Sequence, residues 1–206
     1  MVYEKQITRM IERLAKMGIE DKAVLRAMSR VPRHKFMSEA MAFQAYDEKA
    51  LPIGYGQTIS HPFTVAKMTE LLEIESGNKI LEIGTGSGYQ AAVLLEMKAQ
   101  VWSIELKKQL AVKATKLLSE LGYSIAIRSG DGQLGWKAFA PFNAIIVTAG
   151  APVLPQKLLD QLGVNGRMII PIGSKDKQLL TVYRKGEKGI DKQIIDEFQF
   201  VPLLSK

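Results

Sequence analysis

The feature that most constrains the fold of this chain is a turn of alternating glycines between an apolar segment and a helical one. The turn is Gly84-Thr85-Gly86-Ser87-Gly88, and the short apolar segment Lys79–Ile83 precedes it. Glycine permits positive φ and lets a ligand or a second backbone approach closely. A strand, a glycine-rich turn and a helix in this order are typical of an open α/β sheet, in which ligands bind beyond the carboxyl ends of the strands.

The segments that follow the turn alternate between strand and helix patterns. The pattern predicts strands at 79–83, 101–105, 124–128, 143–148 and 167–171, and helices at 88–96, 107–121 and 155–162. Such alternation indicates a mostly parallel sheet with helices on both faces. Two further strands, 179–183 and 194–201, have no helix between them and should form an antiparallel hairpin. The fold class is therefore α/β, with a doubly wound, Rossmann-like sheet that is mostly parallel and ends in a C-terminal antiparallel hairpin.

The part of the chain before this alternation has a different character. Residues 5–17 have the apolar spacing of an amphipathic helix, and Asp21 is placed to cap a second helix that ends before Pro32. Ala45–Pro62 is rich in Gly, Pro and polar residues, which predicts a long loop, and a helix over 64–72 follows. We expect one domain over 1–206, in which a helical and substrate-loop extension (1–63) precedes a cofactor-binding α/β core (64–206).

The composition limits the chemistry and the location. The 206 residues include no cysteine, which excludes disulfides, Cys-ligated metals and a catalytic thiolate. We expect no metal site. Charged residues such as Lys5 and Arg9 interrupt the N-terminal segment, and no apolar run is long enough to span a bilayer. The sequence therefore predicts no signal peptide and no membrane partner. It predicts a cytoplasmic location.

The net charge of +7 is compatible with a nucleic-acid partner, with an acidic substrate or with solubility alone. The basic residues are spread along the chain, whereas nucleic-acid-binding proteins tend to concentrate positive charge on one face. The charge pattern therefore favours the solubility interpretation, and we expect no nucleic-acid partner.

Acidic residues stand at three successive predicted strand ends. Glu82 lies just before Gly84, where a carboxylate repels a pyrophosphate but favours a cationic amino-acid group. Glu105 follows by about 20 residues, the distance at which a carboxylate accepts ribose hydroxyls. Asp131, flanked by glycines, is placed to accept from an adenine amino group.

The glycine spacing is also G-x-G-x-G, not the G-x-G-x-x-G of dinucleotide sites. This combination favours S-adenosylmethionine, which has no phosphate and carries a sulfonium and an ammonium. The alternative is a tight turn without a ligand.

Several longer stretches resemble the protein-L-isoaspartate O-methyltransferase family, over nearly the whole chain. They are Val31–Phe36 (VPRHKF), Leu51–Gly54 (LPIG), Gln57–Ser60 (QTIS), Ile80–Ala91 (ILEIGTGSGYQA), Gly130–Gly132 with Gly135-Trp136, Ala140–Phe142 followed by Ala144–Ala149, and Phe200–Leu203 (FVPL). The glycine turn is common to many methyltransferases, whereas Gln57–Ser60 and Phe200–Leu203 are far more specific. Two departures are Asn143, where the family generally has Asp, and Asn165, where a Gly-Gly pair is usual.

The resemblance implies an activity and a substrate. The methyl group of S-adenosylmethionine would be transferred to the free α-carboxylate of L-isoaspartyl residues in damaged proteins and peptides, and the ester would then close to a succinimide that reopens partly to aspartate. Ser60 is the implied active-site residue, and the segment Gln57–Ser60 would cover the cofactor. The expected substrate-binding residues are Thr58, Ile59 and Val201, and the expected cofactor-binding residues are Gln57, Glu82, Gly84, Thr85, Gly86, Gly88, Glu105, Leu106, Asp131 and Gly132.

The chemistry of a carboxylate acceptor agrees with this assignment. A carboxyl of this type has a pKa of roughly 3.5, so it is ionised at neutral pH and needs no general base. Alignment of the reacting atoms and exclusion of water are then sufficient sources of catalysis. The hydroxyls of Ser60 and Thr58 could orient the carboxylate without competing as bases, although turn-forming hydroxyls are the alternative.

A nucleic-acid methyltransferase is the main alternative, because the chain is basic, but it fits less well. Cytosine-C5 methylation needs a cysteine, and the segment Thr148–Pro152 does not resemble the Asn-Pro-Pro-Tyr type of motif used for exocyclic amino groups. Glu82 and the glycine spacing disfavour a dinucleotide oxidoreductase. A non-enzymatic cofactor-binding module remains an alternative. We expect a monomer.

Overall fold

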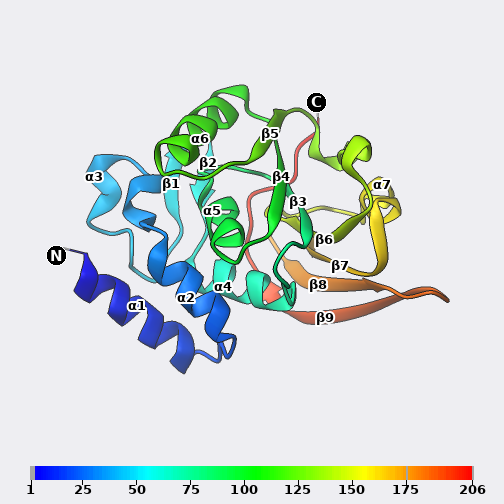
Figure 1. Ribbon diagram of the computed structural model, residues 1–206, viewed down its shortest axis with the longest axis horizontal. Helices are drawn as coiled ribbons and strands as arrows, with labels where there is room; N and C mark the ends of the chain where they lie inside the picture. Colours follow the sequence, from blue (N-terminus) through cyan, green and yellow to red (C-terminus); the bar gives the residue numbers. More distant parts are fainter. Residues whose placement is uncertain (1–2, 175, 206) are drawn as a thin grey trace.

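The computed structural model describes residues 3–174 and 176–205, and its centre is a twisted sheet with helices on both faces (Figure 1). Across the sheet the strands follow the order β5-β4-β3-β6-β7-β8-β9. The strands are β3 (Lys79–Ile83), β4 (Gln100–Glu105), β5 (Ala126–Ser129), β6 (Phe142–Val147), β7 (Leu162–Gly173), β8 (Gln178–Lys185) and β9 (Ile190–Phe198). β3 to β7 are parallel, and β8 runs antiparallel to both of its neighbours. The expected sheet and its antiparallel hairpin are confirmed.

The strand order places a crevice at the centre of the sheet. From β3 the chain proceeds outward through β4 to β5, then returns to the other side of β3 with β6 and proceeds outward again. The connections after β3 and after β6 therefore diverge, and ligands bind at such a switch point. The central strands are apolar on both faces, since both faces are covered: Ile80, Leu81, Ile145 and Ile146 are completely buried.

Helices cover the two faces unequally. One face carries α4 (Pro62–Leu71), α5 (Tyr89–Glu96) and α6 (Lys108–Glu120), and the other carries α7 (Gln156–Asp160) with the short 3₁₀ helices η2 (Gly132–Leu134) and η3 (Lys137–Phe139). α1 (Glu4–Lys16) and α2 (Lys22–Arg30) form a further layer against α4 and α5 (Figure 1). Asp21 caps α2 as expected, because its side chain accepts from the amides of Ala23 and Val24.

The expected long loop over Ala45–Pro62 is wrong. Instead, β1 (Leu51–Gly54) and β2 (Gln57–Ile59) form a separate antiparallel hairpin. Its turn is Gly54-Tyr55-Gly56, in which all three residues have positive φ. Glycine and proline residues suggested a loop, but the glycines form the turn of the hairpin. Pro52 is tolerated because each strand of a two-stranded sheet is an edge strand, which does not need every backbone N–H for pairing. Two short helices, η1 (Arg33–Phe36) and α3 (Glu39–Ala42), were also not expected.

Some boundaries differ from expectation near the C-terminus. β7 begins at Leu162 and not at Arg167, whereas β9 ends at Phe198. The segment after β9 leaves the sheet and returns to its carboxyl edge, where the amide of Gly150 donates to the Val201 carbonyl at 2.8 Å and the amide of Leu203 donates to the Gly150 carbonyl at 2.7 Å. Among the described residues, no helix has the length and apolar character needed to cross a membrane.

Candidate functional site

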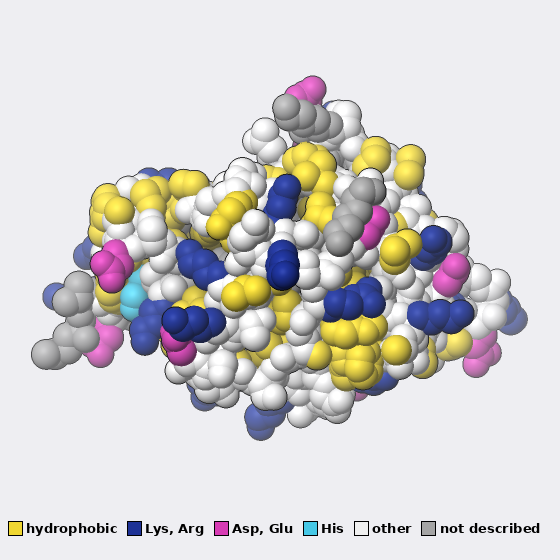
Figure 2. Space-filling model, turned by 90° about the horizontal axis from the view of Figure 1, so that it is seen from above, with side chains coloured by type: hydrophobic (Ala, Val, Ile, Leu, Met, Phe, Trp, Pro, Cys, Tyr) yellow, Lys and Arg dark blue, Asp and Glu magenta, His cyan; other side chains and the backbone are white. Residues whose placement is uncertain are grey.

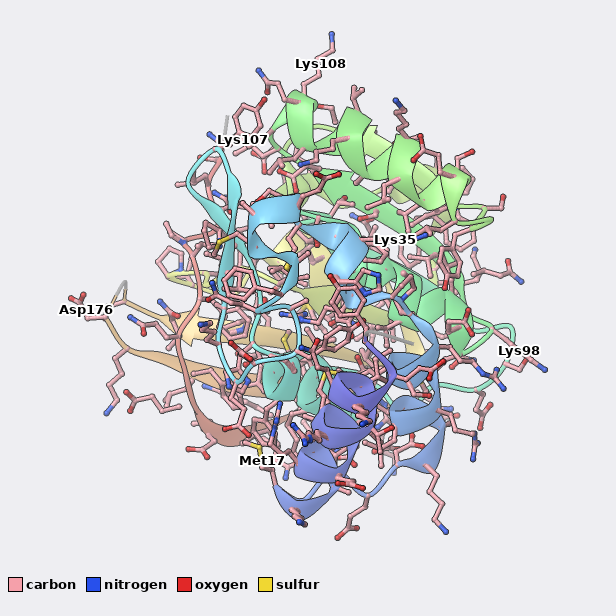
Figure 3. All side chains as sticks on the ribbon, turned by 90° about the vertical axis from the view of Figure 1, so that its left-hand side faces the viewer. Met17, Lys35, Lys98, Lys107, Lys108 and Asp176 are labelled. Atoms are coloured by element: carbon pink, nitrogen blue, oxygen red, sulfur yellow. The ribbon has the colours of Figure 1, made fainter. Side chains whose placement is uncertain are left out.

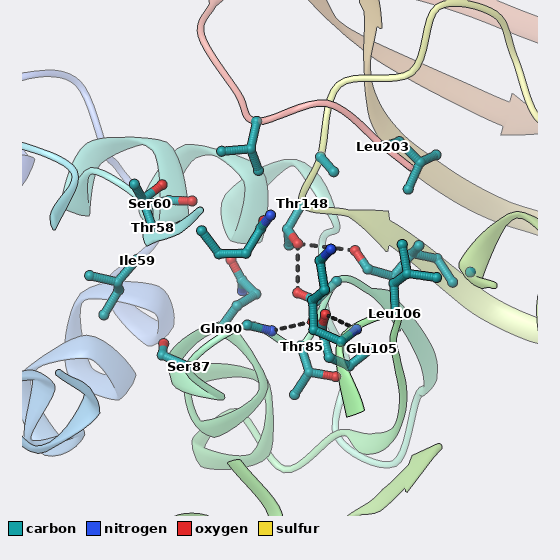
Figure 4. Close-up of a pocket in the computed structure, with 18 of the residues that line it drawn as sticks. Thr58, Ile59, Ser60, Thr85, Ser87, Gln90, Glu105, Leu106, Thr148 and Leu203 are labelled. Atoms are coloured by element: carbon teal, nitrogen blue, oxygen red, sulfur yellow. Dashed lines mark hydrogen bonds between the residues drawn. The ribbon is translucent and has the colours of Figure 1, made fainter. Parts of the chain in front are cut away.

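A cavity of about 890 Å³, which includes part of its open mouth, lies beyond the carboxyl ends of β3, β4 and β6 (Figure 4). Its walls are lined by Gln57, Thr58, Ile59, Ser60, Val65, Met68, Ile83, Gly84, Thr85, Gly86, Ser87, Tyr89, Gln90, Ile104, Glu105, Leu106, Lys107, Gly132, Thr148, Ala149, Val201, Pro202, Leu203 and Leu204. Segments from both ends of the chain thus meet at the crevice of the sheet.

Most of the expected site residues line this one cavity. They are Gln57, Thr58, Ile59, Ser60, Gly84, Thr85, Gly86, Glu105, Leu106, Gly132 and Val201. Figure 4 shows Thr58 and Ser60 on one side of the cavity and Glu105 with Leu106 on the other. The fold therefore brings together the two groups of residues that the sequence assigned to the substrate and to the cofactor.

The glycine turn is fixed by Thr148, which was not among the expected site residues. Thr148, which directly follows β6, donates its hydroxyl to the carbonyls of Gly84 (2.7 Å) and Ile83 (3.0 Å). Gly84 has φ +94°, and a Cβ at this position would overlap Thr148 Oγ1. The signal in the sequence was the position of Thr148 at the end of the strand beside β3.

Glu105 is held in a defined orientation at the cavity wall. Its side chain is buried, and its two carboxylate oxygens accept from the amides of Gly86 (2.8 Å) and Lys107 (2.9 Å). An ionised carboxylate offers about four acceptor positions, so these two bonds leave others for hydroxyl groups. The arrangement suits the two hydroxyls of a ribose.

Glu82 lies below the turn and is not among the cavity-lining residues, contrary to expectation. It is completely buried, and its carboxylate accepts from the Ser103 hydroxyl, which also lies 2.6 Å from the Thr85 hydroxyl. Burial, with repulsion from Glu105, raises the pKa of Glu82 to about 8 despite the Ser103 hydrogen bond. At neutral pH the side chain is therefore mostly uncharged, so the expected attraction between a Glu82 carboxylate and an ammonium does not apply to this geometry.

Gly88 and Asp131 also lie outside the lining. Gly88 has φ +90°, and a Cβ there would lie 3.1 Å from Leu118 Cδ1, so its hydrogen allows α5 and α6 to pack closely. The Asp131 side chain accepts from the Gln133 amide at 2.9 Å and caps η2. The carboxylate is thus engaged locally, whereas the neighbouring Gly132 does line the cavity.

A buried arginine supports the substrate side of the cavity. Arg33 in η1 is completely buried, and it donates to the carbonyls of Ala45 and Ser60, each at 2.7 Å. Its guanidinium lies 4.7 Å from the centre of the Tyr89 ring, and Tyr89 lines the cavity. Burial lowers the pKa of Arg33, and Tyr89 opposes that change. Arg33 lies within the VPRHKF stretch of the sequence, but its residue type and position alone predict no role in the site.

The histidines and Trp136 lie outside the cavity lining. His61 caps α4, since its Nδ1 accepts from the Phe63 amide at 3.0 Å. His34 Nδ1 lies 2.7 Å from the Tyr46 hydroxyl. Trp136 packs against the Arg128 guanidinium, 4.7 Å from the centre of its ring, and against Phe139. The departure Asn143 is exposed at the start of β6, where its Oδ1 accepts from the Lys79 amide.

The lining of the cavity fits S-adenosylmethionine better than a dinucleotide. Among the lining residues of the described chain, Lys107 is the only basic one, so no cluster of cations is available for a pyrophosphate. Figure 3 shows that the neighbouring Lys108 points away from the molecule. The walls instead combine the Glu105 carboxylate, several hydroxyls and apolar side chains such as Leu106. No group of three or more side chains suited to hold a metal ion occurs in the described residues.

Comparison with solved structures shows the same architecture. A protein-L-isoaspartate O-methyltransferase superposes with a TM-score of 0.88 at 27% identity, over 95% of this chain and 65% of that chain. A structure from Plasmodium falciparum, named as a β-aspartate methyltransferase and bound to S-adenosyl-L-homocysteine, superposes with a TM-score of 0.84 at 28% identity, over 96% of this chain and 98% of that chain.

Comparison of sequences covers nearly the whole chain. The family model described as protein-L-isoaspartate(D-aspartate) O-methyltransferase matches residues 5–206. Relatives named protein-L-isoaspartate O-methyltransferase include one from Vibrio campbellii, 50% identical over 198 residues (96% of this chain and 95% of the relative). Another, from Gloeobacter violaceus, is 51% identical over 194 residues (93% and 95%). The chain therefore belongs to the protein-L-isoaspartate(D-aspartate) O-methyltransferase family.

Proposed function

We propose that this chain transfers the methyl group of S-adenosylmethionine to the free α-carboxylate of L-isoaspartyl residues in damaged proteins and peptides, and so starts their repair through a succinimide. The family assignment carries the activity. The observation that carries the assignment of residues is that Ser60 and Glu105, which are distant in sequence, line one cavity at the switch point of the sheet. The chain is proposed to act as a single domain over 1–206.

The cofactor side of the cavity extends from the glycine turn to the end of β4. We assign the ribose hydroxyls to Glu105, whose orientation is already fixed by two amides. Gly84, Gly86 and Thr85 would border the amino-acid portion, and Leu106 and Gly132 the base, with Gln57 closing over the group. When bound, S-adenosylmethionine supplies a methyl group made electrophilic by the sulfonium.

The substrate side is formed by β2 and the C-terminal segment. The Ser60 and Thr58 hydroxyls are proposed to donate to the substrate carboxylate and orient one of its oxygens toward the methyl group, while Ile59 and Val201 exclude water. Val201 is held in place because its carbonyl accepts from the Gly150 amide at 2.8 Å. The acceptor is already ionised, so these residues need only position it.

The remaining proposals concern partners. On the face shown in Figure 2, Lys and Arg side chains are scattered among neutral and apolar ones and do not form one continuous basic stripe. Nucleic-acid binding typically uses a concentrated basic surface. This distribution supports a protein or peptide substrate, with no nucleic-acid or membrane partner. We further propose that the chain acts in the cytoplasm and as a monomer.

One assay tests the activity. Labelled S-adenosylmethionine is offered with an isoaspartyl peptide, with the aspartyl peptide of the same sequence, and with tRNA. Base-labile label on the isoaspartyl peptide alone is the expected result. Label on RNA, or equal label on both peptides, would contradict the proposal.

A variant tests the role of Ser60. Ser60→Ala should lower turnover of the isoaspartyl peptide, because one donor to the carboxylate is lost, with little change in the affinity for S-adenosylhomocysteine. Ser124→Ala, which removes a hydroxyl from an exposed position before β5, is the matched control. Unchanged turnover in Ser60→Ala would remove this residue from the mechanism.

A further inference from the structure

The start of β7 contains a four-residue excursion, Gly163–Gly166, whose residues have no register partners in the neighbouring strands β6 and β8. In the β6–β7 register Phe142 lies opposite Leu162, but Ala144 already lies opposite Arg167. β8 pairs with β7 only from Arg167 onward. Gly163–Gly166 therefore form a bulge between two regularly paired stretches, in which Val164 and Asn165 are exposed and Gly166 is buried.

Asn165 lies in this excursion with its side chain exposed to solvent. Its φ is +62°, a conformation that asparagine tolerates better than most residues. The preceding Val164 is 58% exposed, so solvent reaches the excursion from its outer side. The residue after Asn165 is Gly166, so no side chain of the following residue stands between its backbone nitrogen and the Asn165 side chain. Gly166 itself is buried, and a Cβ at this position would lie 2.8 Å from the Gly163 carbonyl oxygen and 2.9 Å from that of Asn143.

The other two asparagines are in a different situation. The Asn78 Oδ1 accepts from the Glu75 amide at 3.0 Å, and the Asn143 Oδ1 accepts from the Lys79 amide at 2.8 Å. Neither is followed by glycine. No hydrogen bond restrains the Asn165 side chain among the described residues, so its amide is free to rotate toward the backbone.

We propose that Asn165-Gly166 is a site of spontaneous deamidation, and that the isoaspartyl product is a substrate for a second copy of this chain. The Gly166 nitrogen bonds to Asn165 Cγ, the bond from Cγ to Nδ2 breaks, and ammonia leaves with the proton of the Gly166 amide. Water then opens the five-membered imide. Attack at Cγ gives aspartate, whereas attack at the main-chain carbonyl of residue 165 gives isoaspartate with a free α-carboxylate.

The sheet requires that repair occur between molecules. The cavity lies at the carboxyl ends of β3, β4 and β6, whereas Gly163–Gly166 lie at the amino end of the parallel strand β7. The two sites are therefore at opposite edges of the same sheet, and residue 165 cannot reach the cavity of its own molecule. This second part of the proposal rests on the proposed function, whereas the deamidation does not.

The experiment compares the wild-type protein with Asn165→Gly. Glycine adopts the positive φ of this position and has no amide to lose. Both purified proteins are aged at mildly alkaline pH, digested, and analysed by mass spectrometry for conversion of the amide to an acid and for separated aspartyl and isoaspartyl peptides. Portions of the intact aged proteins are then incubated with labelled S-adenosylmethionine and a small amount of fresh enzyme.

We expect conversion at residue 165 in the wild-type protein and a several-fold higher base-labile methyl uptake by aged wild-type protein than by aged Asn165→Gly. Absence of conversion at residue 165 would overturn the proposal. Equal uptake by the two proteins would overturn repair at this site and assign the label to another position, such as Asp131-Gly132. A synthetic isoaspartyl peptide is the positive control: if it too remains unlabelled, the proposed function fails, while the mass measurement still decides the deamidation.

Discussion

Gly84 is the residue whose backbone the cavity depends on most directly. It combines φ +94° with a contact in which any Cβ would overlap the Thr148 hydroxyl. We expect Gly84→Ala to reduce the affinity for S-adenosylhomocysteine at least tenfold and to lower the free energy of unfolding by about 1–3 kcal/mol, the usual cost of a strained backbone. Calorimetric titration and urea unfolding measure the two effects.

Gly122 serves as a control that separates the effect of backbone strain from the effect of steric overlap with Thr148. Gly122 after α6 also has positive φ (+82°), but no heavy atom lies within 4 Å of an added Cβ. Gly122→Ala should therefore cost stability without changing cofactor affinity. Equal losses of affinity in both variants would mean that the contact between Gly84 and Thr148 does not shape the site.

Glu82 should make the stability of the protein depend on pH. The folded protein holds a proton on this carboxyl up to pH about 8, whereas the unfolded chain releases it near the ordinary value of 4.5. Stability contributed by the neutral Glu82 is therefore complete at acidic pH and is lost as the pH rises through this window, by at most about 1.4 kcal/mol per pH unit.

The Glu82→Gln variant tests this dependence, because an amide remains uncharged throughout. In urea unfolding from pH 5.5 to pH 8.5, roughly the window set by linkage, wild type should lose stability relative to Glu82→Gln as the pH rises. Glu187→Gln removes one carboxyl from an exposed turn and controls for net charge. Parallel curves for wild type and Glu82→Gln would show that Glu82 is ionised in the folded protein.

Residues whose backbone position alone places them in the site were predictable from the sequence. Gly84 and Glu105 follow from the strand ends alone, and both line the cavity. The sequence did not reveal the direction in which a side chain points. The Glu82 side chain points into the sheet interior, where it accepts from the Ser103 hydroxyl. The Asp131 side chain turns back to cap its own 3₁₀ helix, because the Gln133 amide is a closer partner than a ligand.

Among the elements, η1 and β2 are joined by Arg33. The guanidinium satisfies the carbonyls of Ala45 and Ser60 and covers the Tyr89 ring. We expect Arg33→Met to lower the free energy of unfolding by about 1.5–3 kcal/mol for each charged hydrogen bond lost, and to raise the KM for an isoaspartyl peptide more than the Kd for S-adenosylhomocysteine.

Two further variants distinguish the geometry of Arg33 from its charge. Arg33→Lys keeps the charge but not the two-pronged geometry, so it should recover stability only in part. Arg30→Met removes an exposed guanidinium from the adjacent α2 and should stay within about 0.5 kcal/mol of wild type. If the KM of the peptide and the Kd of the cofactor change equally in Arg33→Met, Arg33 supports the whole fold and not the substrate side in particular.

The strands and helices of the sheet were predictable because their burial is encoded locally, as in the continuous apolar run of β6. The β1–β2 hairpin was not predicted, although Leu51 and Ile53 are both buried and alternate with exposed residues. With only three or four residues in each strand and three positive-φ positions in the turn, its local pattern is dominated by glycine. The pairing of this hairpin depends on contacts with distant segments, such as the Arg33 bond to Ser60.

Over the whole molecule, the N-terminal extension and the α/β core share one hydrophobic cluster. Met10 and Leu14 of α1 and Met28 of α2 belong to the same cluster as Val93 of α5 and Ile146 of β6. α4 and α5 thus have apolar surface on two sides, toward the sheet and toward α1 and α2. Without residues 1–63, the second surface would be exposed to water, which supports a single folding unit.

This arrangement predicts that the extension and the core unfold together. Both tryptophans, Trp102 and Trp136, lie in the core, so their fluorescence does not report on α1 directly. Leu14 is 2% exposed, and Leu14→Ala should cost about 2–5 kcal/mol. If the cluster is shared, this change in α1 lowers the urea midpoint of the tryptophan signal as much as that of helical circular dichroism.

Met17→Ala, at a 44% exposed position just beyond α1, should leave both midpoints nearly unchanged. A lower midpoint for the helical signal alone would mean that α1 and α2 unfold independently, and residues 1–63 would then be a separate unit docked on the methyltransferase core.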